Sequence, residues 1–235
     1  KLIEVAHEGP ILSKQSGSNQ IGFTLRERLG IKHTTTRKNT LGGFVINATN
    51  LNSKNRTNLF ACVPDWNSSK YKSTREILDS YGVIDPTGKY KKKLFCTTSS
   101  MSANSFGLLL KYETSEKKIC ECHAGNNEIE KILTWDTSIL ASKLNKLKNM
   151  VIVSAKSIKH NNETYFHYKQ AEFLGNPKIE GFFDLIDIGS ITLDHLISQN
   201  QHGDYREQGP LFKLKQTSRS ILFPEYDKID LIAAV

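Results

Sequence analysis

Four cysteines and one neighbouring histidine are the side chains in this sequence that could bind a metal ion. Cys120, Cys122 and His123 form a C-x-C-H sequence, and a zinc site would need Cys62 or Cys96 as a further ligand. The C-x-x-C spacing typical of small zinc sites is absent from the sequence. We therefore expect reduced, buried thiols of an intracellular protein, and no metal site.

Basic side chains gather at three places in the chain. The 235 residues carry a formal net charge of +8 at pH 7, which favours nucleic acid first and an anionic membrane surface second as a partner. At a turn or a strand entrance such side chains can contact DNA phosphates, although a charge run is more often a solvated surface. The predicted DNA-binding groups are Lys32, His33, Arg37 and Lys38; Lys70, Lys72 and Arg75; and Lys91, Lys92 and Lys93.

A polar segment near the C-terminus, QHGDYREQG, has the side chains needed to read base edges. Arg206 can donate two hydrogen bonds to guanine, and Gln201 or Gln208 can bond adenine at two points. His202 and Asp204 can complete a base-pair contact in the major groove. The segment therefore predicts sequence-specific contacts, and the alternative is a flexible surface loop.

Signatures of other protein classes are missing. The sequence has no G-x-S-x-G nucleophile motif and no Walker A motif, and Gly42-Gly43 alone is too weak to indicate a nucleotide site. It also lacks the aromatic strands of common RNA-binding modules. No signal peptide or run of about 18 apolar residues is present, and the chain begins with Lys rather than Met, which suggests a piece of a longer protein.

Hydrophobic periodicity predicts a mixture of helices and strands. Residues 20–29 read as a helix that carries Glu27, and a second helix, capped by Asp136 or Thr137, would bury Ile139, Leu140, Leu144 and Leu147. A third helix is expected towards the end of residues 65–81. The predicted strands cover residues 44–50, 57–63, 94–98, 106–113, 117–123, 150–155, 165–168, 184–191 and 211–214. The first two strands resemble a hairpin, and the whole indicates one α/β or α+β domain.

The order of these features resembles the MvaI/BcnI restriction endonuclease family, which is related to the mismatch-repair nickase MutH in the PD-(D/E)XK superfamily. Three parts of the sequence carry the likeness: IGFTLRERLG with FVINATN and NLFACVP; MVIVSAKS with ETYFHYKQAEFL; and DLIDIGSI with YREQGPLFKL. The resemblance implies a restriction-endonuclease-like fold with a central mixed β-sheet flanked by helices, in a single domain over residues 1–235. It also implies double-stranded DNA as the partner and a prokaryotic, cytoplasmic restriction system as the setting.

The catalytic motif of that family is largely missing here. By resemblance, Glu27 corresponds to the family's helix glutamate, and Asn39 is the acid-like candidate for its metal-binding aspartate. Ile46 and Ala48, on one face of the strand FVINATN, stand where the family has a glutamate and a lysine. Cleavage with Mg²⁺ needs anionic oxygens and a cation, which isoleucine and alanine do not provide.

Two explanations remain open. In the first, the domain binds DNA without cutting it, as an allosteric or targeting module, beside an active nuclease domain or subunit or a homodimer partner, and needs no cofactor. In the second, the chain is an active Mg²⁺-dependent type II restriction endonuclease whose site is rebuilt from acids elsewhere, such as Glu8, Asp65 or Glu121. The loss of both the glutamate and the lysine favours the first explanation.

Overall fold

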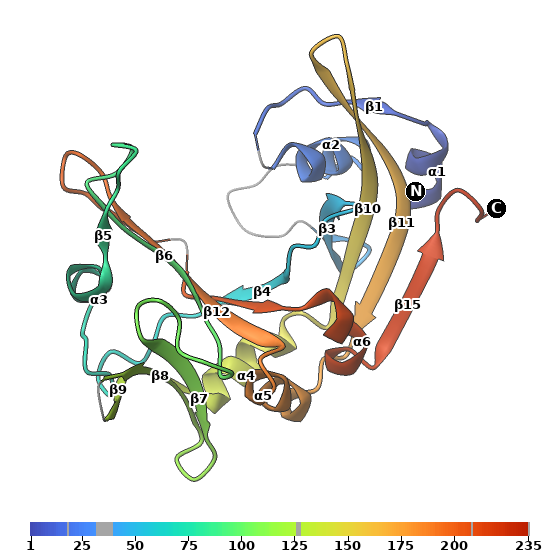
Figure 1. Cartoon of the computed structure of the whole chain (residues 1–235). Coiled ribbons are helices and arrows are strands. Elements are labelled where there is room, and N and C mark those ends of the chain that lie inside the picture. Colours follow the sequence, from blue (N-terminus) through green and yellow to red (C-terminus); the bar gives the residue numbers. More distant parts are fainter. Residues whose placement is uncertain (18, 32–39, 126–127, 208, 235) are drawn as a thin grey trace. The chain divides into compact units, whose positions relative to one another are not determined.

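The computed structural model describes residues 1–17, 19–31, 40–125, 128–207 and 209–234 (Figure 1). The chain folds into two compact units, and it passes between them several times. The first unit contains residues 1–55, 147–177 and 223–235, and the second contains residues 56–146 and 178–222. The single domain expected from the sequence stays a prediction. No described helix is long and apolar enough to span a membrane.

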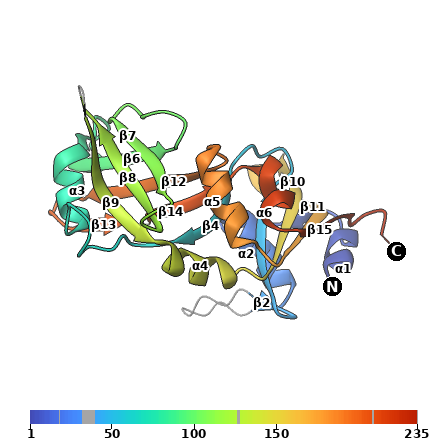
Figure 2. The ribbon, with the colours of Figure 1, turned by 90° about the horizontal axis from the view of Figure 1, so that it is seen from below.

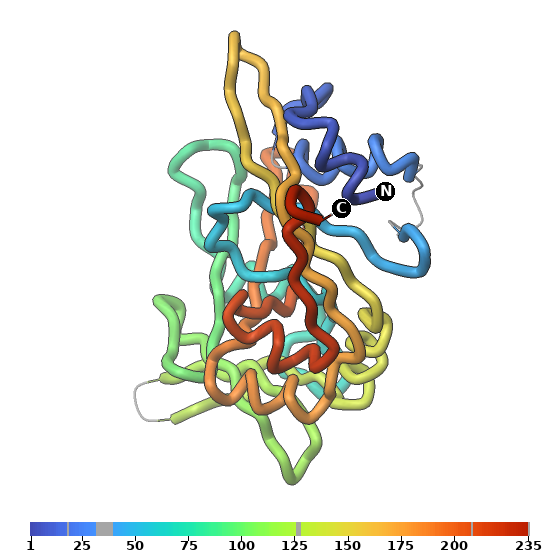
Figure 3. Tube along the Cα trace, turned by 90° about the vertical axis from the view of Figure 1, so that its right-hand side faces the viewer, coloured from blue at the N-terminus to red at the C-terminus, as the bar shows by residue number. Residues whose placement is uncertain are grey.

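The first unit is built on a six-stranded sheet, and it is mixed, as the family resemblance implied. Its longest hairpin, residues 149–175, is the yellow-to-orange pair of tube segments in Figure 3. Its only parallel pair among the described strands joins β3 to β10, and the other pairs are antiparallel. The order is β1 (Ile11–Leu12), β11 (Glu163–Gly175), β10 (Asn149–His160), β3 (Phe44–Asn50) and β2 (Thr40–Leu41), with β15 (Glu225–Asp230) also on β11. The predicted strands at 44–50 and 150–155 are therefore confirmed, because their apolar runs lie inside this sheet.

Two helices, α1 (Leu2–His7) and α2 (Gln20–Arg28), contribute apolar side chains to the core of this unit. Leu25 and Leu29 are four residues apart, so they share one side of α2, and both are buried in the core. The predicted helix at 20–29 is thus confirmed. Gly30 follows it with a φ of +72°, the left-handed conformation in which glycine commonly ends a helix.

The second unit contains two sheets (Figure 2). The larger has the order β4 (Thr57–Ala61), β14 (Leu211–Leu214), β12 (Ile191–Gln199), β6 (Lys92–Thr98) and β5 (Val83–Ile84), with β13 (Tyr205–Glu207) paired to β12. The smaller is an antiparallel sheet of β7 (Leu108–Glu113), β8 (Lys118–Ala124) and β9 (Ile129–Asp136). All pairs in the larger sheet are antiparallel.

One face of the larger sheet is buried by aromatic and helical contacts. The ring of Phe182 lies 5.7 Å from the ring of Phe212 and 5.7 Å from that of Phe60. The helices of this unit are α3 (Thr74–Tyr81), α4 (Thr137–Asn145), α5 (Ile179–Asp187) and α6 (Arg219–Leu222), with a short 3-10 turn at Gln216–Ser218. The N-terminus of α4 is capped as predicted, because the Asp136 carboxylate accepts a hydrogen bond from the Ser138 amide at 2.8 Å.

The buried face also contains an ion pair between the two sheets. His195 of β12 and Glu121 of β8 have no exposed side-chain surface, and His195 Nε2 lies 2.8 Å from Glu121 Oε2. The hydroxyl of Thr98 donates to the other carboxylate oxygen at 2.7 Å. This polar contact lies among apolar neighbours, so it joins the two sheets at a defined register.

Three sequence-based assignments are wrong. Residues 184–191 do not form a strand, because Ile179–Asp187 forms α5, whose buried Phe182, Phe183 and Ile186 recur with helical spacing. Gly189, with a φ of +65°, follows that helix, and the strand begins only at Ile191. The strand-to-strand pairing expected for the first two strands is also wrong, since β3 and β4 belong to different sheets.

The third error concerns the buried side of α4. Leu140 and Leu144 are buried as predicted, but the side chain of Ile139 is 48% exposed. Helix α4 contacts β4 and β9 within its unit, and its buried residues are Leu140 and Leu144. Its apolar side is therefore narrower than the sequence pattern suggested.

Candidate nucleic-acid interface

The face of β3 on which the family would have its catalytic glutamate and lysine belongs here to the hydrophobic core. Ile46 is 2% exposed and pairs with Val151 of β10, and Ala48 pairs with Val153 in the next row. Ile46 belongs to the same buried cluster as Leu25 of α2, and Ala48 packs against that cluster. Because the face is apolar and covered, its side chains provide no oxygen ligand for a divalent cation.

Glu27 lies on α2 but on the side away from this core. It is two residues after the buried Leu25, which corresponds to about 200° around the helix. Its carboxylate instead pairs with Lys14 at 2.7 Å and lines a shallow groove of about 310 Å³. Its assignment as the family's helix glutamate stays a prediction, and Asn39 lies outside the described residues.

The acids considered for a rebuilt metal site have other partners. Glu8 pairs with Arg28 at 3.4 Å, and the Asp65 carboxylate accepts a hydrogen bond from the Ser68 hydroxyl at 2.6 Å. Glu121 is buried against His195. Within the described ranges no group of three or more His, Cys, Asp or Glu side chains is placed to hold a metal ion. Among the described residues, these three acids therefore do not come together as a Mg²⁺ site.

The cysteines also differ from a zinc-binding set. All four are free thiols; Cys62, Cys120 and Cys122 are buried, and Cys96 is partly exposed. Burial raises the pKa of each thiol, to about 12 for Cys96 and about 11 for Cys120. Since the thiolate is the form that binds metal or reacts with electrophiles, these side chains are poor ligands and nucleophiles at neutral pH.

The larger sheet of the second unit has one face that carries polar and charged side chains. Residues directly opposite each other on antiparallel strands share a face. Lys93 of β6 and Arg206 of β13 are both opposite Ser198 of β12, one on each side. The same face continues with Leu196 opposite Phe95, Asp194 opposite Thr97, and Thr192 opposite Lys213. We call these nine residues the polar face.

At one end of the polar face, two cations surround a single carboxylate. The Arg56 guanidinium bonds both oxygens of Asp194, at 2.9 and 3.1 Å, and Lys213 Nζ lies 2.7 Å from Oδ2. Thr97 donates a hydrogen bond to Oδ1 at 2.8 Å, so the buried carboxylate is fully bonded. The Arg56 guanidinium already donates to both oxygens of Asp194. The Lys213 ammonium has three N–H donors, so it can still donate to a ligand after bonding Asp194.

The middle of the polar face presents an aromatic side chain between lysines. Phe95 is 44% exposed, and its ring packs edge-on against that of Tyr90 at 5.7 Å. The ammonium of Lys93 lies 5.9 Å from the Phe95 ring, and that of Lys89 lies 5.3 Å from the Tyr90 ring. Cations beside these rings add positive charge to the middle of the polar face.

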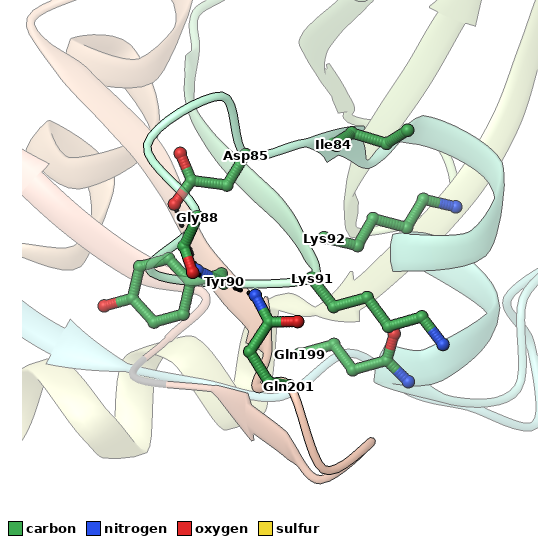
Figure 4. Close-up of a pocket in the computed structure, with 8 residues that line it drawn as sticks. All are labelled: Ile84, Asp85, Gly88, Tyr90, Lys91, Lys92, Gln199 and Gln201. Atoms are coloured by element: carbon green, nitrogen blue, oxygen red, sulfur yellow. Dashed lines mark hydrogen bonds between the residues drawn. The ribbon is translucent and has the colours of Figure 1, made fainter.

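A groove of about 600 Å³ lies beside the β5–β6 turn (Figure 4). Buried Asp85 holds the turn by accepting hydrogen bonds from the Tyr90 amide and from Lys93 Nζ, and the bond from Lys93 lowers the pKa of its carboxyl. Gln201 donates to the Gly88 carbonyl at 2.9 Å and so connects this turn to the β12–β13 loop. The lining consists of Ile84, Asp85, Gly88, Tyr90, Lys91, Lys92, Gln199 and Gln201.

Several of the predicted basic residues already bond carboxylates or backbone carbonyls of the protein. Lys70 pairs with Glu130 at 2.7 Å, and Lys92 reaches Asp79 at 4.0 Å and its carbonyl at 2.9 Å. Lys72 donates to the carbonyls of Asn67 and Ser69, which orders the loop before α3. These contacts with protein groups reduce what each cation can offer to a phosphate.

Arg75 and the tip of the β12–β13 hairpin lie at the other side of the sheet. Arg75 stacks at 5.5 Å over the Tyr205 ring and pairs with Asp79 at 3.6 Å. Asp204 is bonded to Asn200, which closes the tip, while His202 and Arg206 are exposed. Within the predicted polar segment, Tyr205–Glu207 form strand β13, which pairs with β12.

The structure also adds residues to this surface that the sequence did not single out. Arg56, Phe95, Thr97, Asp194 and Lys213 join it through strand pairing between distant segments. The one local pattern that relates any of these residues is the alternation of side chains along a strand. Phe95 and Thr97 are exposed on one face of β6, and Cys96 between them is less exposed. Six predicted residues lie outside the described part of the chain: Lys32, His33, Arg37, Lys38, Asn39 and Gln208.

Known proteins share this architecture. The family model described as the MvaI/BcnI restriction endonuclease family matches residues 1–223. Restriction endonuclease MvaI in a complex with cognate DNA superposes with a TM-score of 0.80 at 18% identity, over 98% of this chain and 95% of that chain. MvaI in the absence of DNA gives a TM-score of 0.54 at 18% identity, over 97% and 94%. No curated protein matches the chain in sequence.

Proposed function

Because the chain belongs to the MvaI/BcnI restriction endonuclease family and has the fold of MvaI, we propose that it binds double-stranded DNA sequence-specifically and does not cleave DNA by itself. The polar face of the second unit is the observation that supports binding. The cations on it and beside it, Arg56, Lys93, Arg206 and Lys213, outnumber the carboxylates Asp194 and Asp85 bonded to them. A net positive surface of this kind attracts the DNA backbone.

Specific recognition is assigned to the exposed donors of the same surface. Arg206 is held in a strand by its pairing with Ser198, so its guanidinium extends from a fixed backbone. The planar guanidinium of an Arg loses less conformational freedom per hydrogen bond when it donates two bonds to guanine. Lys93 and Lys213 on the neighbouring strands would contact phosphates, which sets the register of the protein on the duplex.

The lack of cleavage is proposed from the core packing of β3. In place of the family's glutamate and lysine stand Ile46 and Ala48, and both pack in or against the core under α2. Glu27 is paired with Lys14 on another side of that helix. A domain that binds without cutting would serve as a targeting or allosteric module, beside an active nuclease domain or subunit.

Gel-shift titrations of the purified chain on duplex DNA over a series of salt concentrations test the binding half. We expect the logarithm of the affinity to fall linearly with the logarithm of salt, because phosphate contacts release counterions. A Lys213→Ala variant should reduce the magnitude of this slope by about 1, because one phosphate contact is lost. The control is Lys146→Ala, which replaces an exposed lysine at the end of α4 that is not one of the nine residues of the polar face, and it should leave the slope unchanged. No measurable affinity at low salt would contradict DNA binding.

Replacing Arg206 with alanine is expected to relax the preference for one base pair by about 1–3 kcal/mol. The reason is the loss of two directed hydrogen bonds to one base, whereas phosphate contacts remain. The measurement is competition binding against a library of duplexes, with Lys91→Ala as the matched control. Lys91→Ala should weaken all sequences alike, and uniform weakening by Arg206→Ala would instead make it a phosphate contact.

A further inference from the structure

The strand that carries Arg206 has a carboxylate on its other face. Successive side chains of a strand point to opposite faces, so Glu207 of β13 lies on the face opposite to that of Arg206. The strand pairing agrees with this. Arg206 lies opposite Ser198 of the polar face, and Glu207 lies opposite Ile197, which is buried. The Glu207 carboxylate is thus directed to the covered side of the sheet, where a charged group needs partners.

Helix α3 provides one partner for Glu207. The hydroxyl of Thr74, the first residue of α3, donates a hydrogen bond to Glu207 Oε2. The N-terminus of a helix carries a partial positive charge, which also favours an anion at this place. Arg75, the next residue of the helix, stacks over the ring of Tyr205. The first turn of α3 therefore holds both end residues of β13, a strand that pairs only with β12 among the described strands.

His195 provides the second partner, from the neighbouring strand. Glu207 is diagonal to His195, because Glu207 lies opposite Ile197 and His195 is two residues before Ile197 on β12. Diagonal positions are about 7–8 Å apart, within reach of long side chains. Glu207 Oε1 and His195 Nδ1 are both buried, and neither has a hydrogen-bond partner within the described part of the chain. These two unused atoms are a donor and an acceptor when the imidazole is protonated.

The charges of this cluster support that assignment. Glu121 binds the other ring nitrogen of His195 and favours the protonated imidazole. Burial raises the pKa of the Glu207 carboxyl, and the Thr74 hydrogen bond and the His195 charge oppose that rise. The imidazolium therefore lies between two carboxylates, one on β8 and one on β13, and attraction to it holds Glu207 on the buried side of the strand.

We propose that Glu207 is a positioning residue for sequence recognition: anchored by Thr74 and His195 on the buried side of β13, it fixes the strand from which Arg206 reads a base. The inference rests on the proposed function. Two directed hydrogen bonds from an Arg to one base tolerate little change in distance and angle, so movement of β13 would impair base discrimination first. A phosphate contact by a flexible lysine tolerates such movement.

The test measures base preference by competition binding against the library of duplexes. Glu207→Ala should relax the preference at the base pair read by Arg206 by about tenfold, with little change in affinity for other duplexes, because the phosphate contacts remain. Thr74→Val removes the hydroxyl donor and leaves β13 unchanged, and it should relax the preference at the same base pair. Glu207→Gln should restore part of the preference lost in Glu207→Ala, since its amide oxygen can still accept from Thr74.

A double-mutant comparison separates positioning from a general effect on stability. In the Arg206→Ala background, Glu207→Ala should change the base preference no further, because the side chain that it positions is gone. The matched control is Glu180→Ala, which replaces an exposed carboxylate on α5 and should leave the preference unchanged in both backgrounds.

The outcomes distinguish this role from DNA binding itself. An unchanged preference in Glu207→Ala, equal weakening of all duplexes, or an effect that adds to that of Arg206→Ala would overturn the positioning role and leave DNA binding intact. If circular dichroism shows that Glu207→Ala does not fold, the same comparison with Thr74→Val decides. A wild-type chain without DNA affinity would instead refute the proposed function.

Discussion

Replacing Glu121 with alanine is expected to lower the free energy of unfolding by about 3–5 kcal/mol, because it breaks a buried ion pair by removing one partner. Glu121 and His195 are both inaccessible to solvent and lie 2.8 Å apart between the two sheets of the second unit. Removing the carboxylate leaves the imidazole buried without its partner, and it also leaves the Thr98 hydroxyl without its acceptor.

Urea unfolding followed by circular dichroism measures this loss. Glu116→Ala is the matched control, because Glu116 lies in the turn between β7 and β8 and forms an exposed ion pair with Lys131. That exposed pair should contribute only about 0–1 kcal/mol. Equal losses in the two variants would mean that the buried pair does not stabilise the fold.

The same pair predicts how stability changes with pH. Burial alone would lower the pKa of His195, but the Glu121 carboxylate opposes this and the net effect raises that pKa above its usual value. The stabilisation is therefore fully present below the unfolded value of roughly 6.5, and it is lost as pH rises through the raised pKa of the folded state. Glu121→Gln should remove this part of the pH dependence, and an unchanged profile would contradict the assignment.

Replacing Ile46 with alanine is expected to lower the free energy of unfolding by about 2–5 kcal/mol. Ile46 is 2% exposed in the core beneath α2, so truncation leaves a cavity that its neighbours fill only in part. A residue facing an open metal-binding cleft would lose far less. The control Ile139→Ala, at a half-exposed position on α4, should remain within about 0.5 kcal/mol of wild type.

This measurement bears on function as well as on stability. If Ile46→Ala is nearly neutral, then the face of β3 that carries Ile46 and Ala48 is open, and a carboxylate could be accommodated there. A large loss instead means that an ionised glutamate at this position would have to be buried in an apolar core, which strongly disfavours the charged form. The proposed lack of cleavage depends on the second result.

The sequence predicted the central strands well because their signal is local. The apolar runs at 44–50 and 150–155 are inside strands, and the apolar spacing at 20–29 identified α2. It failed at 184–191, where a short apolar run fits a strand or a buried helix equally well. The neighbouring Phe182 and Phe183 decide for the helix, since they extend its apolar side.

The candidate interface was only partly predictable, because its residues come together through pairing between distant segments. Lys93 and Arg206 were predicted from composition, but Arg56 and Lys213 meet Asp194 from 138 and 19 residues away in sequence. No local pattern predicts which antiparallel strands will pair. The same holds for Glu121 and His195, 74 residues apart, whose buried contact depends on the packing of two sheets.

We propose centrally that this chain binds duplex DNA through the second unit and that β3 does not provide a catalytic site. The most direct measurement incubates the purified chain with supercoiled plasmid and Mg²⁺ or Mn²⁺, at concentrations where gel shifts show the DNA to be bound. We predict bound plasmid that stays supercoiled. Nicked or linear plasmid formed by the wild-type chain, and abolished by Glu27→Ala, would contradict the account.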